Sequence, residues 1–235
     1  LFDVGMNANE GDPSPLEVNM QRLGVSLDEV QAIVISHNHP DHVGGVKWWR
    51  ANTLSPGNQQ VDLSDKVIYV PEALNYPGVT PIVANQPTKV GVGVVTLGTI
   101  PFAEVWQVAL FRARNAEQAL AINIEGKGVV IITGCGHQTL PKLIARTQAL
   151  FDEPIVGIVG GLHFENANAQ QLEPYIRQLR ELKLEVIAPS PHDSGEAARQ
   201  AFRQAFPNQY QDVLVGAPIY FGSTSQAGDI RETIP

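Results

Sequence analysis

The feature that most restricts the fold of this chain is the segment at residues 36–42, which reads Ser-His-Asn-His-Pro-Asp-His. It directly follows residues 31–35, a short apolar run with β-branched side chains that predicts a buried strand. Imidazole nitrogen and carboxylate oxygen are donors that zinc binds readily. A solvated loop rich in turn-forming residues is the alternative. So many donors directly after a buried strand favour a metal site at the end of that strand instead.

Side-chain direction within this segment suggests how it would divide its donors. Residues two apart in an extended or tightly turned backbone can present their side chains on the same side. His37 and His39 could thus hold one cation. Asp41 and His42 extend beyond the turn and could reach a second.

The other three histidines, His137, His163 and His192, each follow a run that predicts a strand. Any one of them alone would more often be a structural hydrogen-bonding residue than a ligand. Ligand sites in layered α/β proteins gather at the carboxyl ends of strands, so all six histidines can converge on one edge of the fold. Glycines beside these histidines would let the backbone turn sharply and approach closely.

Hydrophobic patterning predicts an α/β chain in which helices cover sheets in layers. We expect a single domain over residues 1–235, with a loop at 52–60 and an irregular excursion at 76–91. Strands are predicted at 66–70, 92–97, 104–110, 118–124, 129–133, 155–159, 184–188 and 213–215. Helices are predicted at 43–49, 140–150, 170–182 and 195–206.

Charge and composition narrow the classes of partner. The net charge is −8 and no long Lys/Arg cluster is present, which argues against nucleic acid. The acidic balance also argues against an anionic substrate, unless bound cations reverse the local field. No apolar run approaches the roughly 18 residues of a membrane span. We therefore expect a small-molecule substrate and no nucleic-acid or membrane partner.

The single cysteine and the first residues carry weaker expectations. Cys135 cannot form an internal disulfide, which suits a reducing compartment, and we expect a cytoplasmic protein. Residues 1–5, Leu-Phe-Asp-Val-Gly, read like the middle of a strand and its exit turn, without an initiator Met. We expect further residues, including N-terminal strands, to precede Leu1 in the natural protein.

The segment at 36–42 resembles the His-x-His-x-Asp-His signature of the metallo-β-lactamase-fold superfamily. Later segments resemble downstream motifs of one branch, whose members are often named as relatives of dihydropterin-ribofuranosyl-aminobenzene-phosphate synthase. These segments are Glu-Gln-Ala-Leu at 117–120, Thr-Gly-Cys-Gly-His at 133–137, Gly-Gly-Leu-His at 160–163 and His-Asp-Ser-Gly at 192–195. The resemblance implies a four-layer αββα sandwich with two mixed sheets and a metal site at one edge, usually dinuclear and usually zinc.

Carried over residue by residue, the resemblance implies two sets of ligands. The first metal would be held by His37, His39 and His137, and the second by Asp41, His42 and His192. It also implies that Asp3 orients a ligand histidine through a hydrogen bond. One or two zinc ions per chain are expected, with manganese or iron as alternatives.

Two positions depart from the common pattern. His163 is also expected as a metal ligand, and it stands where most of the superfamily has an Asp that bridges both metals. An imidazole binds one metal, so either water alone bridges or the second metal is held more weakly. Asp193 stands where the branch commonly has Cys, and it could be a ligand, a partner of a ligand or a proton acceptor. Cys135 is most simply a small buried residue, with a redox or ligand role as the alternative.

The chemistry expected of such a site is hydrolysis of an ester bond in a small molecule by metal-activated hydroxide. Analogy with the family favours a phosphoester. Asp41 would position the water, and His163 or Asp193 would transfer a proton to the leaving group. Two alternatives remain open at the level of the sequence. One is a metal-dependent oxidoreductase or dioxygenase on the same fold, and the other is a non-catalytic sensor or interaction protein that binds metal for structure.

Overall fold

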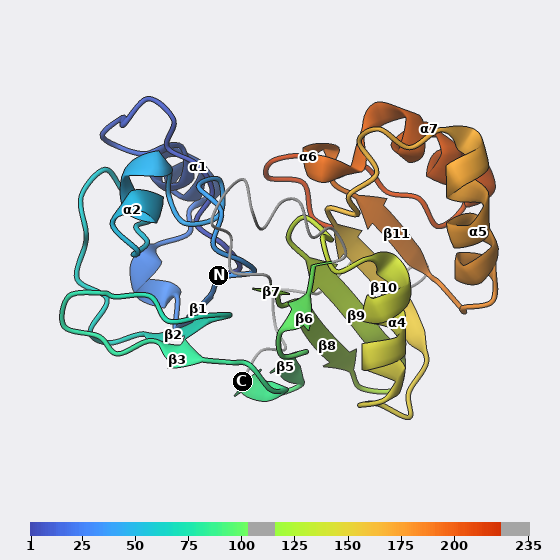
Figure 1. Cartoon of the computed structure of the whole chain (residues 1–235), viewed down its shortest axis with the longest axis horizontal. Coiled ribbons are helices and arrows are strands. Elements are labelled where there is room, and N and C mark those ends of the chain that lie inside the picture. The colour runs from blue at the N-terminus through green and yellow to red at the C-terminus, as the bar shows by residue number, and fades with distance from the viewer. Residues whose placement is uncertain (103–115, 222–235) are drawn as a thin grey trace.

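The computed structural model describes residues 1–102 and 116–221, which form two sheets with helices beside them (Figure 1). The first sheet contains β1 (Ala32–Val34), β2 (Val67–Val70) and β3 (Ile82–Val83), all parallel. The second has the order β11-β10-β9-β8-β5-β4. Its strands are β4 (Thr88–Gly91), β5 (Val94–Thr96), β8 (Leu120–Ile124), β9 (Gly128–Thr133), β10 (Ile155–Gly160) and β11 (Val186–Pro189). The short strands β6 (Ile100–Pro101) and β7 (Ala116–Glu117) pair with each other.

The second sheet is mixed. Strands β9, β10 and β11 are parallel to one another, whereas β4, β5, β8 and β9 pair in antiparallel fashion. Parallel neighbours end at the same edge of a sheet, so the loops that follow β9, β10 and β11 come out side by side. This arrangement brings together the segments that carry the later histidines.

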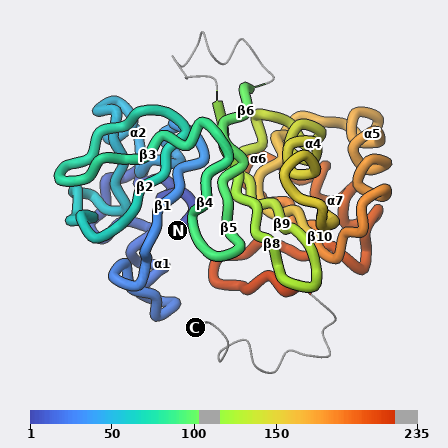
Figure 2. Tube along the Cα trace, turned by 90° about the horizontal axis from the view of Figure 1, so that it is seen from below, coloured from blue at the N-terminus to red at the C-terminus, as the bar shows by residue number. Residues whose placement is uncertain are grey.

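Helices lie beside both sheets (Figures 1 and 2). The first sheet is accompanied by α1 (Pro15–Leu23), the short helix η1 (Leu27–Glu29) and α2 (Val46–Arg50). The second is accompanied by α4 (Leu140–Gln148), α5 (Ala169–Arg180), the single turn α6 (Pro191–Ser194) and α7 (Glu196–Ala205). No helix of the described ranges is long and apolar enough to cross a membrane.

Three apolar clusters show how these layers pack. One joins the second sheet to α4, α5 and α7, through residues such as Ile131, Leu143 and Phe202. Another joins the first sheet to its helices, with Ile33 as a central residue and Trp49 packed against it. A smaller third cluster lies between the sheets and contains residues from both, namely Val34, Tyr69, Ala84 and Leu120. Helix, sheet, sheet and helix thus form the αββα order that the family resemblance implies. The expectation of two mixed sheets is wrong for the first sheet, because β1, β2 and β3 pair in parallel.

The amphipathic pattern predicts the outer helices of the second sheet well. In α5 the apolar residues at helical spacing, Leu172, Ile176 and Leu179, are buried, as expected for a helix that packs one face on a sheet. The expected strands at 66–70, 118–124, 129–133, 155–159 and 184–188 correspond to β2, β8, β9, β10 and β11. The strand expected at 104–110 lies outside the described residues.

Three further expectations, each about one segment of the chain, need correction. The strand predicted at 213–215 is absent, because only Tyr210 bridges to Ile187 there, and Leu214 and Val215 are exposed. The excursion at 76–91 is more regular than predicted, since it contains β3 and β4. The helix expected at 43–49 begins only at Val46, since Gly44 and Gly45 adopt positive φ angles that a helix cannot include.

Helix α1 is a further element that was not predicted. Ser14 caps this helix, because its hydroxyl accepts the Glu17 N–H while the Glu17 carboxylate accepts the Ser14 N–H. Pro15 occupies the first helical position, where its missing N–H costs nothing. This capping box is a readable signal for a helix start.

Candidate metal centre

All six histidines meet at the ends of β1, β9, β10 and β11. The ring of His37 lies 4.1 Å from that of His42, 4.4 Å from His39 and 4.9 Å from His137, measured between centroids. Rings from the later segments extend this array. His163 lies 4.5 Å from His137, and His192 lies 5.4 Å from His42. The convergence on one edge that the sequence predicts is therefore present.

Asp3 fixes the orientation of His42. One carboxylate oxygen, Oδ2, lies 2.7 Å from His42 Nδ1, and it also accepts the Ser36 hydroxyl at 2.8 Å. The other oxygen accepts the Ser36 backbone N–H at 2.6 Å. Because Nδ1 faces the carboxylate, His42 presents Nε2 to the centre of the site. A carboxylate behind a ligand histidine sets the direction of its ring in this way.

Asp41, His42 and His192 form the more open part of the site. His192 Nε2 lies 3.0 Å from Asp41 Oδ2, and His42 Nε2 lies 3.4 Å from the same oxygen. Burial opposes a charge on His42, but the Asp3 carboxylate raises the pKa of His42 to about 10. Burial alone would raise the pKa of Asp41, yet hydrogen bonds from His192 and His42 hold it well below its usual range. The Asp41 carboxylate thus lies beside two histidines whose protons a bound cation could replace.

His37, His39 and His137 form the more buried part. Burial lowers the pKa of His37 and His39, and it lowers that of His137 to about 3. His37 Nε2 lies 3.0 Å from His39 Nδ1. Both ring nitrogens of His137 are buried, and neither has a hydrogen-bond partner among the described residues. A neutral imidazole with an unused lone pair is the form that binds metal, so these residues fit a divalent cation.

His163 and Asp193 are held in an unusual backbone conformation. Each has a φ angle of 56°, in the left-handed region that non-glycine residues rarely adopt. The Asp193 carbonyl accepts the Phe164 backbone N–H at 2.9 Å, which ties the two loops together. The Asp193 carboxylate then lies 4.0 Å from His163 Nδ1 and 3.9 Å from His192 Nε2. Backbone strain of this kind is often found at functional sites.

Glu117 and Gln118 hold the loop that carries His137. The Glu117 carboxylate is fully buried and accepts the backbone N–H groups of Cys135, Gly136 and His137 at 2.9, 3.1 and 2.8 Å. Burial raises the pKa of Glu117 to about 7, although these N–H groups act in the opposite direction. Gln118 donates its backbone N–H to the Ser36 carbonyl at 2.8 Å and thereby joins the run at 117–120 to the segment at 36–42. The run at 117–120 is therefore the support of the site.

Close backbone contact between two loops requires glycine, as the sequence suggests. A Cβ added at Gly136 would lie 2.7 Å from the Gly161 carbonyl oxygen, and one added at Gly161 would collide with the Gly134 carbonyl oxygen. Gly136 also has a φ angle of 83°. These two glycines allow the loops of His137 and His163 to touch.

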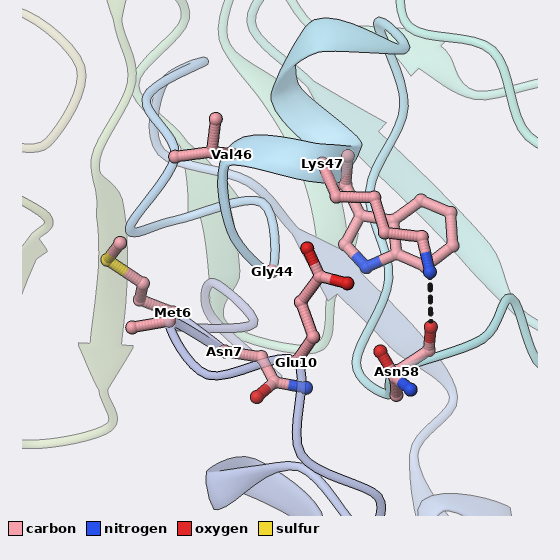
Figure 3. Close-up of a pocket in the computed structure, with 9 residues that line it drawn as sticks. Met6, Asn7, Glu10, Gly44, Val46, Lys47 and Asn58 are labelled. Atoms are coloured by element: carbon pink, nitrogen blue, oxygen red, sulfur yellow. Dashed lines mark hydrogen bonds between the residues drawn. The ribbon is translucent and has the colours of Figure 1, made fainter.

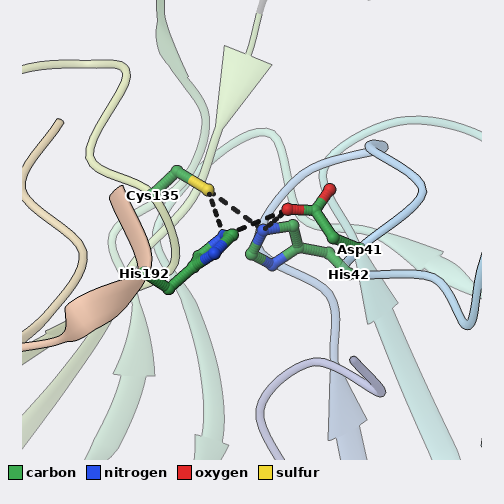
Figure 4. A group of neighbouring side chains, drawn as sticks. All are labelled: Asp41, His42, Cys135 and His192. Atoms are coloured by element: carbon green, nitrogen blue, oxygen red, sulfur yellow. Dashed lines mark hydrogen bonds and ion pairs between the residues drawn. The ribbon is translucent and has the colours of Figure 1, made fainter. Parts of the chain in front are cut away.

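Three groups of metal-ligating atoms overlap at this place, and within each group the atoms lie within 4.8 Å of one another. The groups are Asp41, His42, Cys135 and His192 (Figure 4); His37, Cys135 and His137; and His137, His163 and Asp193. The His192 side chain is 47% exposed and that of Asp41 is 30% exposed. The first group is therefore open to solvent at Asp41 and His192, while His42 and Cys135 are buried. A site that must admit a substrate keeps such an opening.

A separate cavity of about 40 Å³ lies beside Gly44 (Figure 3). Met6, Asn7 and Lys47 are among its lining residues, and Lys47 Nζ donates to the Asn58 carbonyl at 2.9 Å. Its volume holds little more than a water molecule. We therefore do not assign a substrate to it.

Comparison with known proteins agrees with this geometry. The family model of the metallo-beta-lactamase superfamily matches residues 1–53, which include Asp3 and the segment at 36–42. A crystal structure described as a metal-dependent hydrolase of the beta-lactamase superfamily is similar with a TM-score of 0.68 and 22% identity, over 94% of this chain and 88% of that one. This chain has the metallo-β-lactamase fold.

Two further proteins are similar to this chain. An isothiocyanate hydrolase from Delia radicum gut bacteria has a TM-score of 0.51 and 17% identity, over 90% of this chain and 82% of that one. The 7,8-dihydropterin-6-methyl-4-(beta-D-ribofuranosyl)-aminobenzene-5'-phosphate synthase of Methanocaldococcus jannaschii is 23% identical over 94% of this chain and 84% of its own length. The resemblance to the branch named for this synthase is confirmed.

Within the metallo-β-lactamase fold of this chain, two residues matter more than their sequence context suggests. Cys135 belongs to two of the three ligand groups. From the sequence alone, a lone cysteine at a strand end is most simply interpreted as a small side chain buried in the core. Glu117 supports the His137 loop, and only its resemblance to a family motif singled it out beforehand. Neither role has a local pattern, because the partners lie far away in the sequence.

Proposed function

We propose that this chain is a metal-dependent hydrolase of a small-molecule ester, with a phosphoester as the favoured substrate. The observation that carries the proposal is the continuous array of ligand groups, buried at His37 and open to solvent at His192. A metal needed only for structure is usually enclosed by protein ligands, whereas a catalytic one keeps a position for water or substrate.

The proposed ligands are the two sets that the family resemblance implies. His37, His39 and His137 would hold one cation, and a second set would hold another, consisting of Asp41, His42 and His192. Zinc suits imidazole and carboxylate donors, and manganese or iron are alternatives. When bound, such cations supply a water of lowered pKa and polarise the scissile bond. They also supply the positive field that a chain with a net charge of −8 otherwise lacks.

Residues of the chain provide the remaining functions in this proposal. Asp3 holds the ring of His42 in direction through its 2.7 Å contact with Nδ1. Asp41, whose low pKa keeps it ionised, orients an attacking water by accepting a hydrogen bond from it. His163 and Asp193, with ring nitrogen and carboxylate oxygen 4.0 Å apart, border the site from the other side, where they can pass a proton to the leaving group.

The substrate class and compartment are also part of the proposal. The name of the M. jannaschii relative describes a product that carries a phosphate, which supports a phosphorylated small molecule. A reducing compartment such as the cytoplasm would keep the one cysteine of this metal-rich site from oxidation.

The test is hydrolysis of a panel of phosphomonoesters, phosphodiesters and carboxylic esters by metal-loaded protein, with metal content measured in the same samples. We expect turnover of at least one phosphoester, and a loss of turnover in Asp41→Asn and Asp193→Asn. Glu125→Gln, in the exposed turn between β8 and β9, is the matched control for a lost carboxylate. A protein that holds about two metals per chain and leaves the whole panel intact would refute the preference.

A second candidate function is a synthase reaction, because the curated relative that aligns with 94% of this chain is named as a synthase. The same donor array would then activate a group of a phosphorylated substrate for condensation rather than hydrolysis. Incubation of the metal-loaded protein with an aminobenzene ribofuranoside phosphate and a reduced pterin that carries a leaving group on its methyl carbon, followed by mass spectrometry, distinguishes the two. The bond to the leaving group breaks as the new bond to the methyl carbon forms. A condensed product in place of hydrolysis would favour the synthase.

A further inference from the structure

Cys135 occupies the junction of the candidate metal centre. Its side chain is buried, and its Sγ lies 3.0 Å from His42 Nε2 and 3.3 Å from His192 Nε2. Figure 4 shows the thiol directed at both imidazoles, with the Asp41 carboxylate nearby. A cysteine that only filled space would face apolar side chains, whereas this one faces nitrogen atoms that are candidate ligands.

A second observation points to a ligand at the same place. His137 is 5% exposed, and both of its ring nitrogens lack a hydrogen-bond partner among the described residues. Leaving buried polar atoms without a partner is costly, so such atoms usually indicate a missing ligand. His137 and His37 place ring nitrogens within 4.8 Å of the Cys135 sulfur. The space between these three residues is therefore bordered by imidazole on two sides and by sulfur on the third.

Membership of the ligand groups distinguishes Cys135 from every carboxylate of the site. In the described part of the chain, Asp41 belongs to one group and Asp193 to another, and neither is shared. His137 belongs to two groups but has two nitrogens to divide between them. Cys135 also belongs to two groups, and it contributes the same sulfur atom to both.

We propose that Cys135 is a thiolate ligand shared by both metal positions, with one side of its sulfur toward Asp41, His42 and His192 and the other toward His37 and His137. This inference rests on the proposed metal centre and adds to it the atom that joins its two halves. A thiolate has several lone pairs and can bind two cations at once, whereas one imidazole nitrogen binds one. Sulfur would thus take the bridging position for which His163 is unsuited.

Charge and proton balance are consistent with this role. A free cysteine thiol has a pKa of about 8.5 and therefore carries its proton near neutral pH. Binding of a divalent cation breaks the S–H bond, forms a metal–sulfur bond and releases one proton to solvent. The site gains two positive charges from the cation and loses one with the proton, and no oxidant or reductant is required.

Titration of the metal-free protein with Co²⁺ tests the proposal without reference to activity. Sulfur bound to Co²⁺ gives a charge-transfer band in the near ultraviolet, and the chain contains one cysteine, so the band identifies Cys135. We expect the band to grow over two equivalents of Co²⁺, because the same sulfur binds both ions. Growth that stops after one equivalent would show a ligand to a single metal and would overturn the bridge.

Cys135→Ser provides the matched variant, because it preserves the size of the side chain. We expect this variant to lose the band completely and to bind the second Co²⁺ at least tenfold more weakly than the unmodified protein. Its far-ultraviolet circular dichroism should stay unchanged. If the variant does not fold, the band of the unmodified protein still decides the matter. Two bound Co²⁺ ions without a sulfur band would refute the role of Cys135 and leave the metal centre intact.

The remaining outcomes separate this inference from the proposed function. A chain that binds no Co²⁺ or Zn²⁺ after reconstitution overturns both, since no ion is present for Cys135 to hold. A sulfur band over two equivalents together with no hydrolysis of any ester supports the shared thiolate and refutes the hydrolase.

Discussion

The support that Glu117 gives to the His137 loop leads to a prediction whose size follows from the structure. In Glu117→Gln, the remaining carbonyl oxygen can still accept the N–H groups of Cys135 and Gly136, which both point to Oε1. The new NH₂ group would take the place of Oε2, which accepts the His137 N–H at 2.8 Å in the unmodified protein. One buried donor would lose its partner and would meet a second donor instead.

The expected loss is the cost of leaving one buried donor without a partner, about 1–3 kcal/mol of the free energy of unfolding. Loss of the charge itself should cost little near neutral pH, because burial already raises the pKa of Glu117 to about 7. For a chain of this length each kcal/mol lowers Tm by roughly 2–4 °C, so we expect a decrease of roughly 2–12 °C. Glu117→Ala would leave three donors unsatisfied and is too severe to interpret.

Urea denaturation followed by tryptophan fluorescence at pH 7 measures the effect, with and without zinc. Because the loop also positions His137, zinc affinity should fall together with stability, and zinc should recover less stability than in the unmodified protein. Glu125→Gln, which replaces an exposed carboxylate, should change neither quantity. Equal urea midpoints and equal zinc affinity for Glu117→Gln and the unmodified protein would show that the three N–H groups do not depend on this carboxylate.

Three further predictions follow from the site. The pKa of His42 is raised to about 10 in the metal-free protein, and His42 must lose its proton to bind metal. Zinc binding at pH 7 should therefore release a proton, which calorimetry in buffers of different ionisation enthalpy would measure. Asp3→Asn should release one proton fewer and bind zinc about 10–100-fold more weakly, and unchanged proton release in this variant would contradict the pairing of Asp3 with His42. The raised pKa of His42 also stabilises the metal-free protein, and this contribution is complete below about pH 6.5 and is lost as pH rises through about 10. The free energy of unfolding should fall by up to about 1.4 kcal/mol per pH unit in this range. An unchanged urea midpoint between pH 7 and 10 would argue against the raised pKa. Gly161→Ala should cost about 1–3 kcal/mol or more because its Cβ collides with the Gly134 carbonyl oxygen, whereas Gly91→Ala, with open space around it, is the control, and similar Tm values for the two variants would exclude that collision.

Much of the site was predictable because its ligands follow strands whose apolar residues are easy to recognise. His37 and His39 come directly after β1, and His163 after β10, so strand assignment alone placed them at sheet ends. The helices of the second sheet were predictable for a similar reason, since burial of one face requires apolar residues at helical spacing, as in α5.

Residues whose roles depend on distant partners were not predictable in the same way. The contacts of Cys135 are with His42, 93 positions earlier, and with His192, 57 positions later. Residues 213–215 show the reverse case, an element that was predicted but did not form. An apolar triplet forms a strand only if a sheet edge is available to pair with it. Here Tyr210 takes the single bridge to Ile187, and Val215 remains 80% exposed.

The wide separation of the ligands along the chain also bears on when this protein can acquire a metal. The group of Asp41, His42, Cys135 and His192 draws on three segments, and it is complete only after β11 has paired with β10. A chain that has not yet formed this pairing presents the local donors of residues 36–42 without His192, and such a partial set would rank divalent cations by intrinsic affinity rather than by geometry. Selection among metals would begin late in folding, when the full set of donors is fixed in space.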